Sequence, residues 1–407
     1  MRVRSLPKAI TATLGVQAII VIASLVVPLT AAGIAPGLGL DPHLVGSYAS
    51  LTFLAAAAAS LATPQWVRRY GAIRVHQIML LAAAAGLVVL LAETLAGFIL
   101  SALLLGLAYG PANPASSSLL SRYTSSGTRA RVFAIKQTAV PLGGAVAGFV
   151  VPFLMTRIGW LGAALAVAAV CFIGAILVGG WRHALDGQGD DSPPVGRTGA
   201  VAALRLISAS ASLRPLGIMA VCFAATQFNF TAVFAAVLVE RMRWSPIQAG
   251  STLSIAMAVS AASRLGWGWV ADHAPPRFVL AALGTMMAAA TLACAFLAPA
   301  WPDLVVYAIA FLSGASGSSW NGLALSEAAH FAPTGHVGEA TAGIMFFIYT
   351  GALIGPALFS LVTSVTGTVT IAFLLLGLLA LLPVPLLLWA EYRAASSNPL
   401  EPQYEGH

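Results

Sequence analysis

Residues Ile371–Ala390 read IAFLLLGLLALLPVPLLLWA, twenty consecutive positions without a charged side chain. A run of this length is what an α-helix needs to cross the hydrocarbon core of a bilayer. A second run, Val16–Ala35, reads VQAIIVIASLVVPLTAAGIA near the other end of the chain. Strands of membrane barrels alternate apolar and polar residues, so unbroken runs of this kind favour helices.

The composition of the whole chain agrees with these two runs. Of 407 residues, 59% are hydrophobic and only 8% are charged. Soluble domains carry about 25% charged residues, so this chain cannot cover an aqueous surface. In lipid the backbone must satisfy its own hydrogen bonds, which restricts a spanning chain to helices or closed barrels. We therefore predict an all-α membrane protein.

Mostly apolar segments long enough to span a bilayer recur twelve times, in two sets of six. The first set is 11–35, 44–63, 74–92, 96–120, 131–155 and 160–181. The second set is 215–239, 246–270, 278–299, 303–328, 339–363 and 368–390. This pattern predicts an N-terminal six-helix bundle at 1–181 and a C-terminal six-helix bundle with a short tail at 215–407.

The stretch 182–214 between the two sets is predicted to be a central loop. It contains DGQGDDSPP at 186–194, a polar composition that cannot bury itself and is typical of a linker. Its last part, Val201–Leu213, is apolar enough for an interfacial helix with Arg205 towards water.

Lysine and arginine are distributed unevenly over the predicted loops. With the N-terminus inside, fifteen of the 20 fall on inner segments, three fall on outer loops, and Lys136 and Arg264 fall within spans. This positive-inside bias places both termini and the central loop in the cytoplasm. It also explains the net charge of +7 without nucleic acid, which we do not expect as a partner. The three cysteines all fall within spans, so no disulfide framework is expected.

The two sets of spans carry matching residues in the same order. Asp41–Gly46 (DPHLVG) matches Ser245–Gly250 (SPIQAG) at an offset of 204. At an offset of 208, first-half residues match second-half residues in the pairs Gly106 and Gly314, Asn113 and Asn321, Gly127 and Gly335, Ala134 and Ala342, and Gly143 and Gly351. A parallel duplication of this kind, with a site near the midplane between the halves, is a transporter architecture.

With these features the chain resembles the major facilitator superfamily over essentially its whole length. The family carries a loop signature after spans 2 and 8, a glycine four residues before an aspartate followed by basic residues. Gly268–Asp272 and Arg277 match it, whereas the first copy has Arg68 where the acid normally sits. In that family the acid and basic residues pair across the cytoplasmic face and hold the outward-open state. The resemblance carries this latch role to Asp272 and Gly268 only.

Span 8 bears a further, looser resemblance. The spacing Arg264…Gly268…Asp272 is similar to span 8 of oxalate and monocarboxylate transporters, where the arginine binds the substrate carboxylate. The acidic-Gly-aromatic signature that the monocarboxylate families carry in span 1 is absent here. Span 5 only loosely resembles the Gly-Pro signature of drug antiporters.

The charged residues within the spans are the main candidates for a site, because a charge at bilayer depth is costly. Arg264 lies about 12 Å along the helix from Asp272, and its planar fork suits a carboxylate. Its alternative role is a structural ion pair. Lys136 is either a second cationic contact in the cavity or a side chain that reaches the interface.

Acidic residues are scarce within the spans. Glu327 is the one clearly inside, so it is the candidate for proton coupling, with an ion pair to a basic loop residue as the alternative. Two buried cations against one acid favour an anionic substrate. Neutral residues expected to complete the cavity are Gln17, Tyr109, Asn113, Gln227, Trp320, Asn321 and Tyr349. Each of them could instead serve interhelical packing.

No metal-ligand spacing, nucleotide-binding loop or catalytic set is evident, so we expect neither an enzyme nor a cofactor. The sequence predicts a secondary or facilitative transporter of a small organic anion, such as a carboxylate, working by alternating access. Efflux of hydrophobic drugs is the first alternative, and a non-transporting sensor on the same fold is the second. The expected partners are the substrate and the bilayer, the expected unit is a monomer, and the arginine- and alanine-rich composition suggests a bacterial inner membrane.

Overall fold

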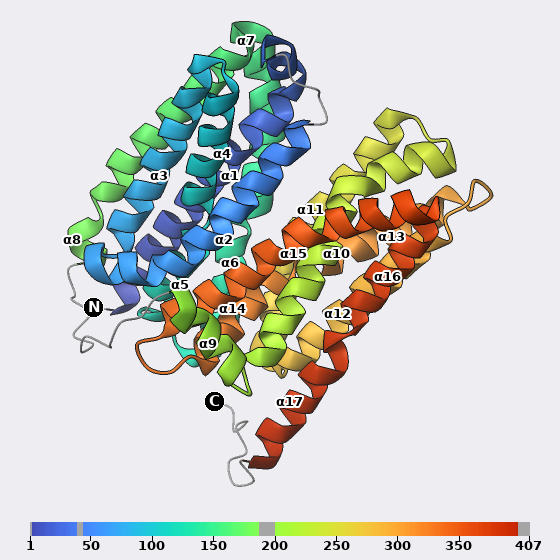
Figure 1. The fold of residues 1–407 in the computed structure, drawn as a ribbon. Coiled ribbons are helices and arrows are strands. Elements are labelled where there is room, and N and C mark those ends of the chain that lie inside the picture. Colours follow the sequence, from blue (N-terminus) through green and yellow to red (C-terminus); the bar gives the residue numbers. More distant parts are fainter. Residues whose placement is uncertain (1, 39–43, 187–199, 398–407) are drawn as a thin grey trace.

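The structure is a computed structural model that describes residues 2–38, 44–186 and 200–397. The Asp41–Pro42 part of the first repeat and most of the polar linker therefore lie outside the described residues. Figure 1 shows two helical bundles, one built from the first half of the chain and one from the second. All regular structure in the described ranges is helical.

The helices of the first bundle are α1 (Arg2–Leu38), α2 (Leu44–Tyr70), α3 (Ala72–Val89), α4 (Leu95–Tyr109), α5 (Ala112–Ser121), α6 (Arg129–Gln137), α7 (Ala139–Gly179) and the short α8 (Arg182–Leu185). After the linker, α9 (Ala200–Ala209) falls on the predicted interfacial segment, with Arg205 exposed. The second bundle consists of α10 (Arg214–Met242), α11 (Pro246–His273), α12 (Pro276–Ala295), α13 (Asp303–Gly317), α14 (Trp320–Phe331), α15 (Val337–Thr366), α16 (Val369–Leu381) and α17 (Pro383–Ser397).

All twelve predicted spans fall on these helices, and the prediction of an all-α membrane protein is confirmed. By length and composition alone, eight helical segments of the described chain could cross a membrane. One of them, Arg129–Gly179, contains two predicted spans, and the chain turns between them at Gly159, where φ is 73°. The predicted spans outside these eight lie on α2, α11 and the pair α13–α14. Of these, α2 and α11 carry many of the polar residues of the central cavity described below.

Spans 4 and 10 are each broken into two helices, where the sequence suggested continuous ones. The first break separates α4 from α5 between Tyr109 and Ala112, and the second separates α13 from α14 between Gly317 and Trp320. The two breaks are 208 residues apart, the offset of the sequence repeat. Pro111 and Pro114 remove backbone donors at the first break.

Glycines at repeat-related positions allow close helix contacts within each bundle. A Cβ at Gly106 would meet the carbonyl of Thr52, and a Cβ at Gly314 would meet the carbonyl of Ala256. Thr52 and Ala256 are themselves related by the offset of 204, so the two halves share the same contact between their second and fourth spans. Small residues are what allow such close approach in membrane bundles.

Gly355 on α15 offers a direct test of this packing. A Cβ there would meet the backbone of Ala225 on α10, with no flexible side chain to yield. Gly355→Val is expected to destabilise the fold by about 1–3 kcal/mol through overpacking. A lower yield of monodisperse protein and a lower melting temperature in detergent would show it. Gly266→Val is the matched control, since a Cβ at Gly266 meets open space. Equal stability of the two variants would contradict the packing argument.

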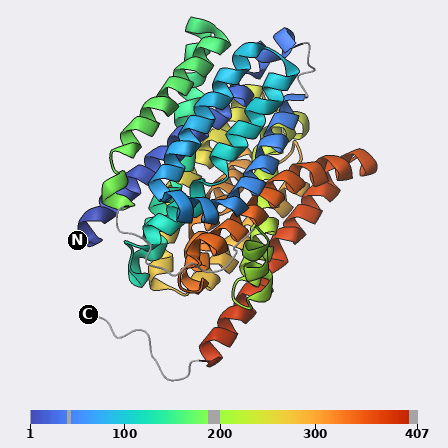
Figure 2. The ribbon, with the colours of Figure 1, turned by 60° about the vertical axis from the view of Figure 1, so that its left-hand side comes forward.

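The two bundles meet mainly along two pairs of helices, α2 with α15 and α11 with α6. Further contacts join α5 to α15, α6 to α14 and α7 to α11. The two main pairs join spans 2 and 11 and spans 8 and 5, which are equivalent under the repeat. In Figure 2, turned by 60° about the vertical axis, the yellow and orange helices of the second bundle lie behind the first bundle, and the N-terminus and α17 both lie in the lower half of the view.

Candidate functional site

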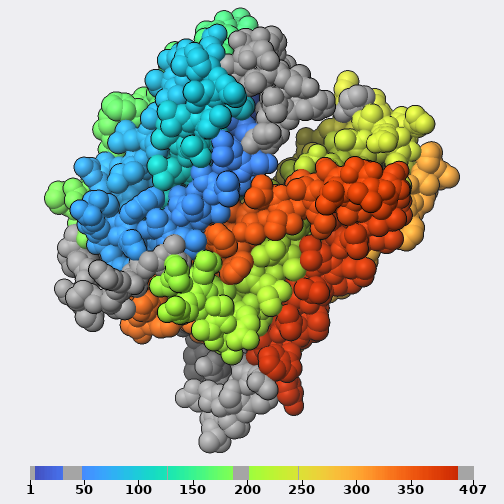
Figure 3. Space-filling view, viewed as in Figure 1, coloured from blue at the N-terminus to red at the C-terminus, as the bar shows by residue number. Residues whose placement is uncertain are grey.

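A cavity of about 850 Å³ lies between the two bundles. Its walls come from α1, α2, α4 and α7 of the first half and from α10, α11, α12 and α13 of the second. Figure 3 shows the molecule hollowed between the bundles at the upper end, away from α17. The location between two repeat-related halves is where a transporter substrate site is expected.

Arg264 is the one charged side chain among the residues that line this cavity in the described chain. The other lining groups are hydroxyls, one side-chain amide and apolar side chains. The polar ones include Ser24, Tyr48, Thr52, Gln227, Thr231, Ser254, Ser260, Ser313 and Ser318. The apolar ones include Leu25, Phe53, Phe149, Phe228, Leu253, Met257 and Met287. A mainly apolar pocket with few polar groups is typical of a small-molecule site.

Arg264 on α11 is only 4% exposed and spans the interface between the halves. Its Nη1 donates a hydrogen bond to the backbone carbonyl of Gln137 on α6. This carbonyl is available because Pro141, four residues later, has no N–H to donate to it. The Nε of Arg264 is buried without a partner in the described chain. One edge of the guanidinium is therefore held by the first bundle, while a buried donor is left for a ligand.

Lys136 lies near Arg264 but does not line the cavity. Its Nζ is buried and donates to Oε1 of Gln17 on α1 at 3.0 Å and to Oδ1 of Asn113 on α5. Asn113 in turn donates from Nδ2 to the sulfur of Met345, across the interface, at 3.3 Å. The three predicted residues Lys136, Gln17 and Asn113 therefore form one buried cluster, which we call the lysine cluster, behind the cavity wall.

Four aromatic rings gather at the interface of the bundles. Phe53 lies with its ring centroid 5.2 Å from Phe228, 6.2 Å from Tyr349 and 6.4 Å from Tyr109. Tyr349 donates its hydroxyl proton to the carbonyl of Tyr109 at 3.3 Å. Tyr109 and Tyr349 were predicted site residues, whereas Phe53 and Phe228 were not. No polar atom marks them, and an apolar residue facing a cavity looks in sequence like one facing lipid.

The remaining neutral candidates meet at Gln227. Its Oε1 accepts two hydrogen bonds, one from Nε1 of Trp320 and one from Nδ2 of Asn321, each at 3.1 Å. Gln227 lines the cavity, while Trp320 and Asn321 lie behind it. Asn113 and Asn321 are equivalent under the repeat. They are also alike in their contacts, because each forms a hydrogen bond with a polar residue of its own bundle.

Glu327 lies away from the cavity, in an ion-pair network with α12. Its carboxylate is 3.7 Å from Nε of Arg277, which also lies 3.9 Å from a carboxylate oxygen of Glu391. Arg277 further donates to the carbonyl of Ser212 and lies over the ring of Phe331. These contacts correspond to the alternative role of Glu327, a partner for a basic loop residue.

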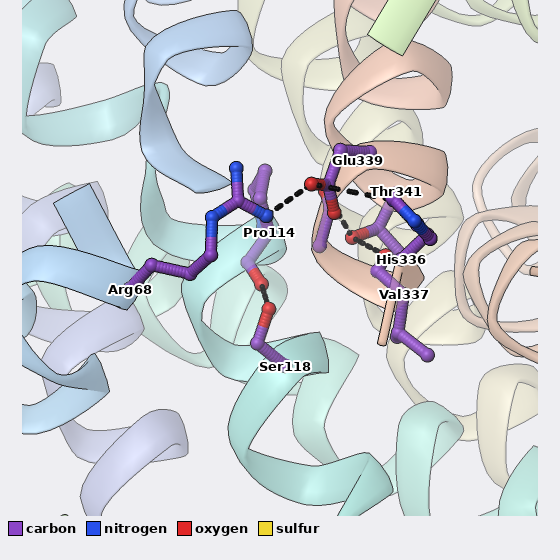
Figure 4. Close-up of polar contacts among 8 residues, drawn as sticks. Arg68, Pro114, Ser118, His336, Val337, Glu339 and Thr341 are labelled. Atoms are coloured by element: carbon purple, nitrogen blue, oxygen red, sulfur yellow. Dashed lines mark hydrogen bonds and ion pairs between the residues drawn. The ribbon is translucent and has the colours of Figure 1, made fainter. Parts of the chain in front are cut away.

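Two ion pairs close the interface at the end of the molecule opposite the hollow. Asp272 at the end of α11 lies 3.0 Å from Nε of Arg131 at the start of α6. Gly268, one turn earlier, allows close contact with Ala134 of α6. Arg68 at the end of α2 pairs with Glu339 at the start of α15, as Figure 4 shows.

These two latches are repeat equivalents with opposite polarity. Arg68 and Asp272 are related by the offset of 204, and Arg131 and Glu339 by the offset of 208. The sequence left Arg68 without a role because it replaced the expected acid. The structure supplies its partner, and the side chain of Glu339 is 4% exposed. His336 lies 3.6 Å from the same carboxylate.

Comparison with known proteins agrees with this architecture. The sequence model of the Major Facilitator Superfamily matches residues 12–349. The E. coli fucose:proton symporter FucP, in an asparagine-to-alanine variant, superposes with a TM-score of 0.76 and 13% identity, over 95% of this chain and 99% of that chain.

FucP in the outward conformation gives a TM-score of 0.74 and 16% identity, over 94% and 98% of the two chains. The human organic anion transporter MFSD10 (TETRAN) gives 0.70 and 16%, over 95% and 99%. At these identities the likeness shows the fold alone. None of the curated proteins matches the sequence.

Proposed function

Since this chain belongs to the Major Facilitator Superfamily and is a multi-pass membrane transporter, we propose that it moves a small organic anion bearing a carboxylate. The observation that carries the proposal is Arg264: among the described residues it is the one charged side chain of the cavity wall, and its buried Nε has no partner there. A planar guanidinium binds a carboxylate through two parallel hydrogen bonds and stays charged at any physiological pH.

The charge balance of the cavity supports an anion over a cation. The lining residues of the described chain include Arg264 and no carboxylate. A cationic drug would meet an uncompensated positive charge in a mainly apolar pocket, where electrostatic repulsion is strong. Drug efflux, favoured only by the apolar side chains of the wall, is therefore the second candidate.

The arrangement of contacts supports alternating access as the mechanism. The bundles are joined at one end by two ion pairs and hollowed at the other, and Arg264 crosses the interface between them. Opening the latched end while closing the hollowed end would expose Arg264 to the opposite side. With the termini in the cytoplasm, as the lysine and arginine distribution predicts, the cavity of this structure opens outwards.

The test is substrate counterflow in proteoliposomes. We expect saturable exchange of at least one of labelled lactate, oxalate and benzoate, measured against protein-free liposomes because weak acids also cross lipid. Unlabelled carboxylates should compete, and the lipophilic cation tetraphenylphosphonium should not. Absence of saturable exchange for all three anions would overturn the substrate class, and saturable uptake of the cation instead would establish the efflux alternative.

A further inference from the structure

Lys136 is a buried amine that has no carboxylate beside it in the described part of the chain. The residue is 2% exposed. The two side chains that accept hydrogen bonds from its Nζ, Gln17 and Asn113, are neutral amides. Within the described residues no carboxylate pairs with it, whereas Arg68, Arg131 and Arg277 all have acidic partners. A buried charge without a counter-ion is costly, and an amine can avoid the cost by releasing its proton.

The ionisable groups around the lysine cluster increase this cost. Arg264 on α11 interacts electrostatically with Lys136 and has the same sign. His76 on α3 also interacts with it, and its ring is held by the carbonyl of Ala72 at 2.6 Å and by Ser116 on α5 at 3.2 Å. Among the described residues, the phenol of Tyr109 on α4 interacts electrostatically with Arg264, and that of Tyr349 on α15 interacts with Tyr109. Neither phenol supplies a negative charge at neutral pH.

We propose that Lys136 is the proton carrier of the transporter, neutral while the cavity is empty and protonated when an anion binds Arg264. The inference rests on the proposed function and adds its coupling ion. A carboxylate on Arg264 cancels the nearest positive charge and places a negative one close to the lysine cluster. Both changes favour the ammonium over the amine, so anion and proton bind together.

The proton balance of the cycle is simple. On the side where the cavity is open, the lone pair of Nζ takes a proton from water as the anion binds. The chain then carries one anion and one proton through the change of access. On the other side, departure of the anion restores the repulsion from Arg264, and the ammonium returns its proton to water. The lysine itself ends the cycle as the neutral amine.

The location of the lysine cluster suits such exchange. Lys136 is followed directly by Gln137, whose carbonyl accepts from Arg264, and by the end of α6 at that residue. Any movement that separates α11 from α6 therefore breaks the Arg264 contact beside the lysine. Glu327, the carrier expected from the sequence, lies outside the cavity wall and already has Arg277 as a partner.

The inference is tested by the number of protons taken up on binding. Purified protein is titrated calorimetrically with sodium benzoate, lactate and oxalate at neutral pH, in two buffers that differ in ionisation enthalpy. We expect the apparent enthalpy to depend on the buffer and to correspond to an uptake approaching about one proton per anion. Lys136→Gln and Lys136→Arg should bind the same anion without buffer dependence, because one is never charged and the other always is.

The outcomes separate the two proposals. If the wild-type protein binds an anion with the same enthalpy in both buffers, the coupling inference is wrong and the proposed function stands. Undiminished proton uptake in both folded variants would also exclude Lys136 as the carrier. If none of the three anions binds, the proposed function itself fails. In proteoliposomes, a pH gradient should drive accumulation by the wild type and should not drive it in either variant, beyond the protein-free control.

Discussion

Arg264→Ala is expected to lower the affinity for the transported carboxylate by about 100-fold while the protein still folds. A hydrogen bond to a charged group contributes about 1.5–3 kcal/mol, and a bidentate pair contains two. Since 1.4 kcal/mol corresponds to a factor of ten, a loss of roughly 3 kcal/mol accounts for the expected change. The measurement is the half-saturation concentration for counterflow, together with the melting temperature to verify folding.

Two further variants make this result specific. Arg264→Lys keeps the charge but lacks the fork, so its affinity should lie between those of the wild type and Arg264→Ala. Arg157→Ala removes an exposed arginine outside the cavity and serves as the control. Unchanged half-saturation in folded Arg264→Ala would assign the residue to its alternative role as a structural link between the bundles.

Arg68→Glu is expected to shift the population away from the state with the closed latches by roughly 5- to 150-fold. The substitution places two carboxylates together and leaves the buried Glu339 without its cation, a loss of about 1–3 kcal/mol when the partial exposure of Arg68 is considered. Reversing the pair, with Arg68→Glu and Glu339→Arg together, should restore the population. The repeat-equivalent pair of Arg131 and Asp272 has the opposite polarity, which supports this expectation.

The readout is the labelling rate of Ser254→Cys, a position in the cavity wall, by a maleimide that cannot cross the membrane. The three native cysteines are buried and give little background. Labelling from the side where the cavity opens should fall in Arg68→Glu and recover in the double variant. Arg69→Glu, a charge reversal at the next residue, is the control. A double variant as poorly labelled as the single one would show that the contact does not act as a pair.

Much of the architecture can be read from the sequence, because membrane helices are specified by their own composition. Each span must be apolar over its whole length, so the twelve helical positions follow from local sequence. The offsets of 204 and 208 likewise relate equivalent contacts in the two halves. Gly106 contacts Thr52 in the first half, and Gly314 contacts Ala256 in the second. Arg264 could be chosen in advance because a charge in a span is costly wherever its partner lies.

Contacts between segments far apart in the chain could not be predicted in the same way. The sequence shows Arg68 and Glu339, 271 residues apart, but nothing local says that α2 and α15 meet. Phe53 and Phe228 were missed because lipid-facing and cavity-facing phenylalanines have the same local pattern. The sequence left open whether Lys136 faces the cavity or reaches the membrane interface, and it did not show the third position, behind the cavity wall, since that depends on the rotation of α6 about its axis.

The polarity of the two latches has a consequence for how the halves recognise each other. Arg68 and Arg131 both belong to the first bundle, while Asp272 and Glu339 both belong to the second. Each bundle therefore presents one sign at this surface, and a bundle facing a second copy of itself would oppose like charges at both positions. Although the halves carry repeat-related residues, their surfaces are complementary in charge at these two positions, as in a pair of different proteins. The charges favour contact between the two different bundles over contact of either bundle with a copy of itself.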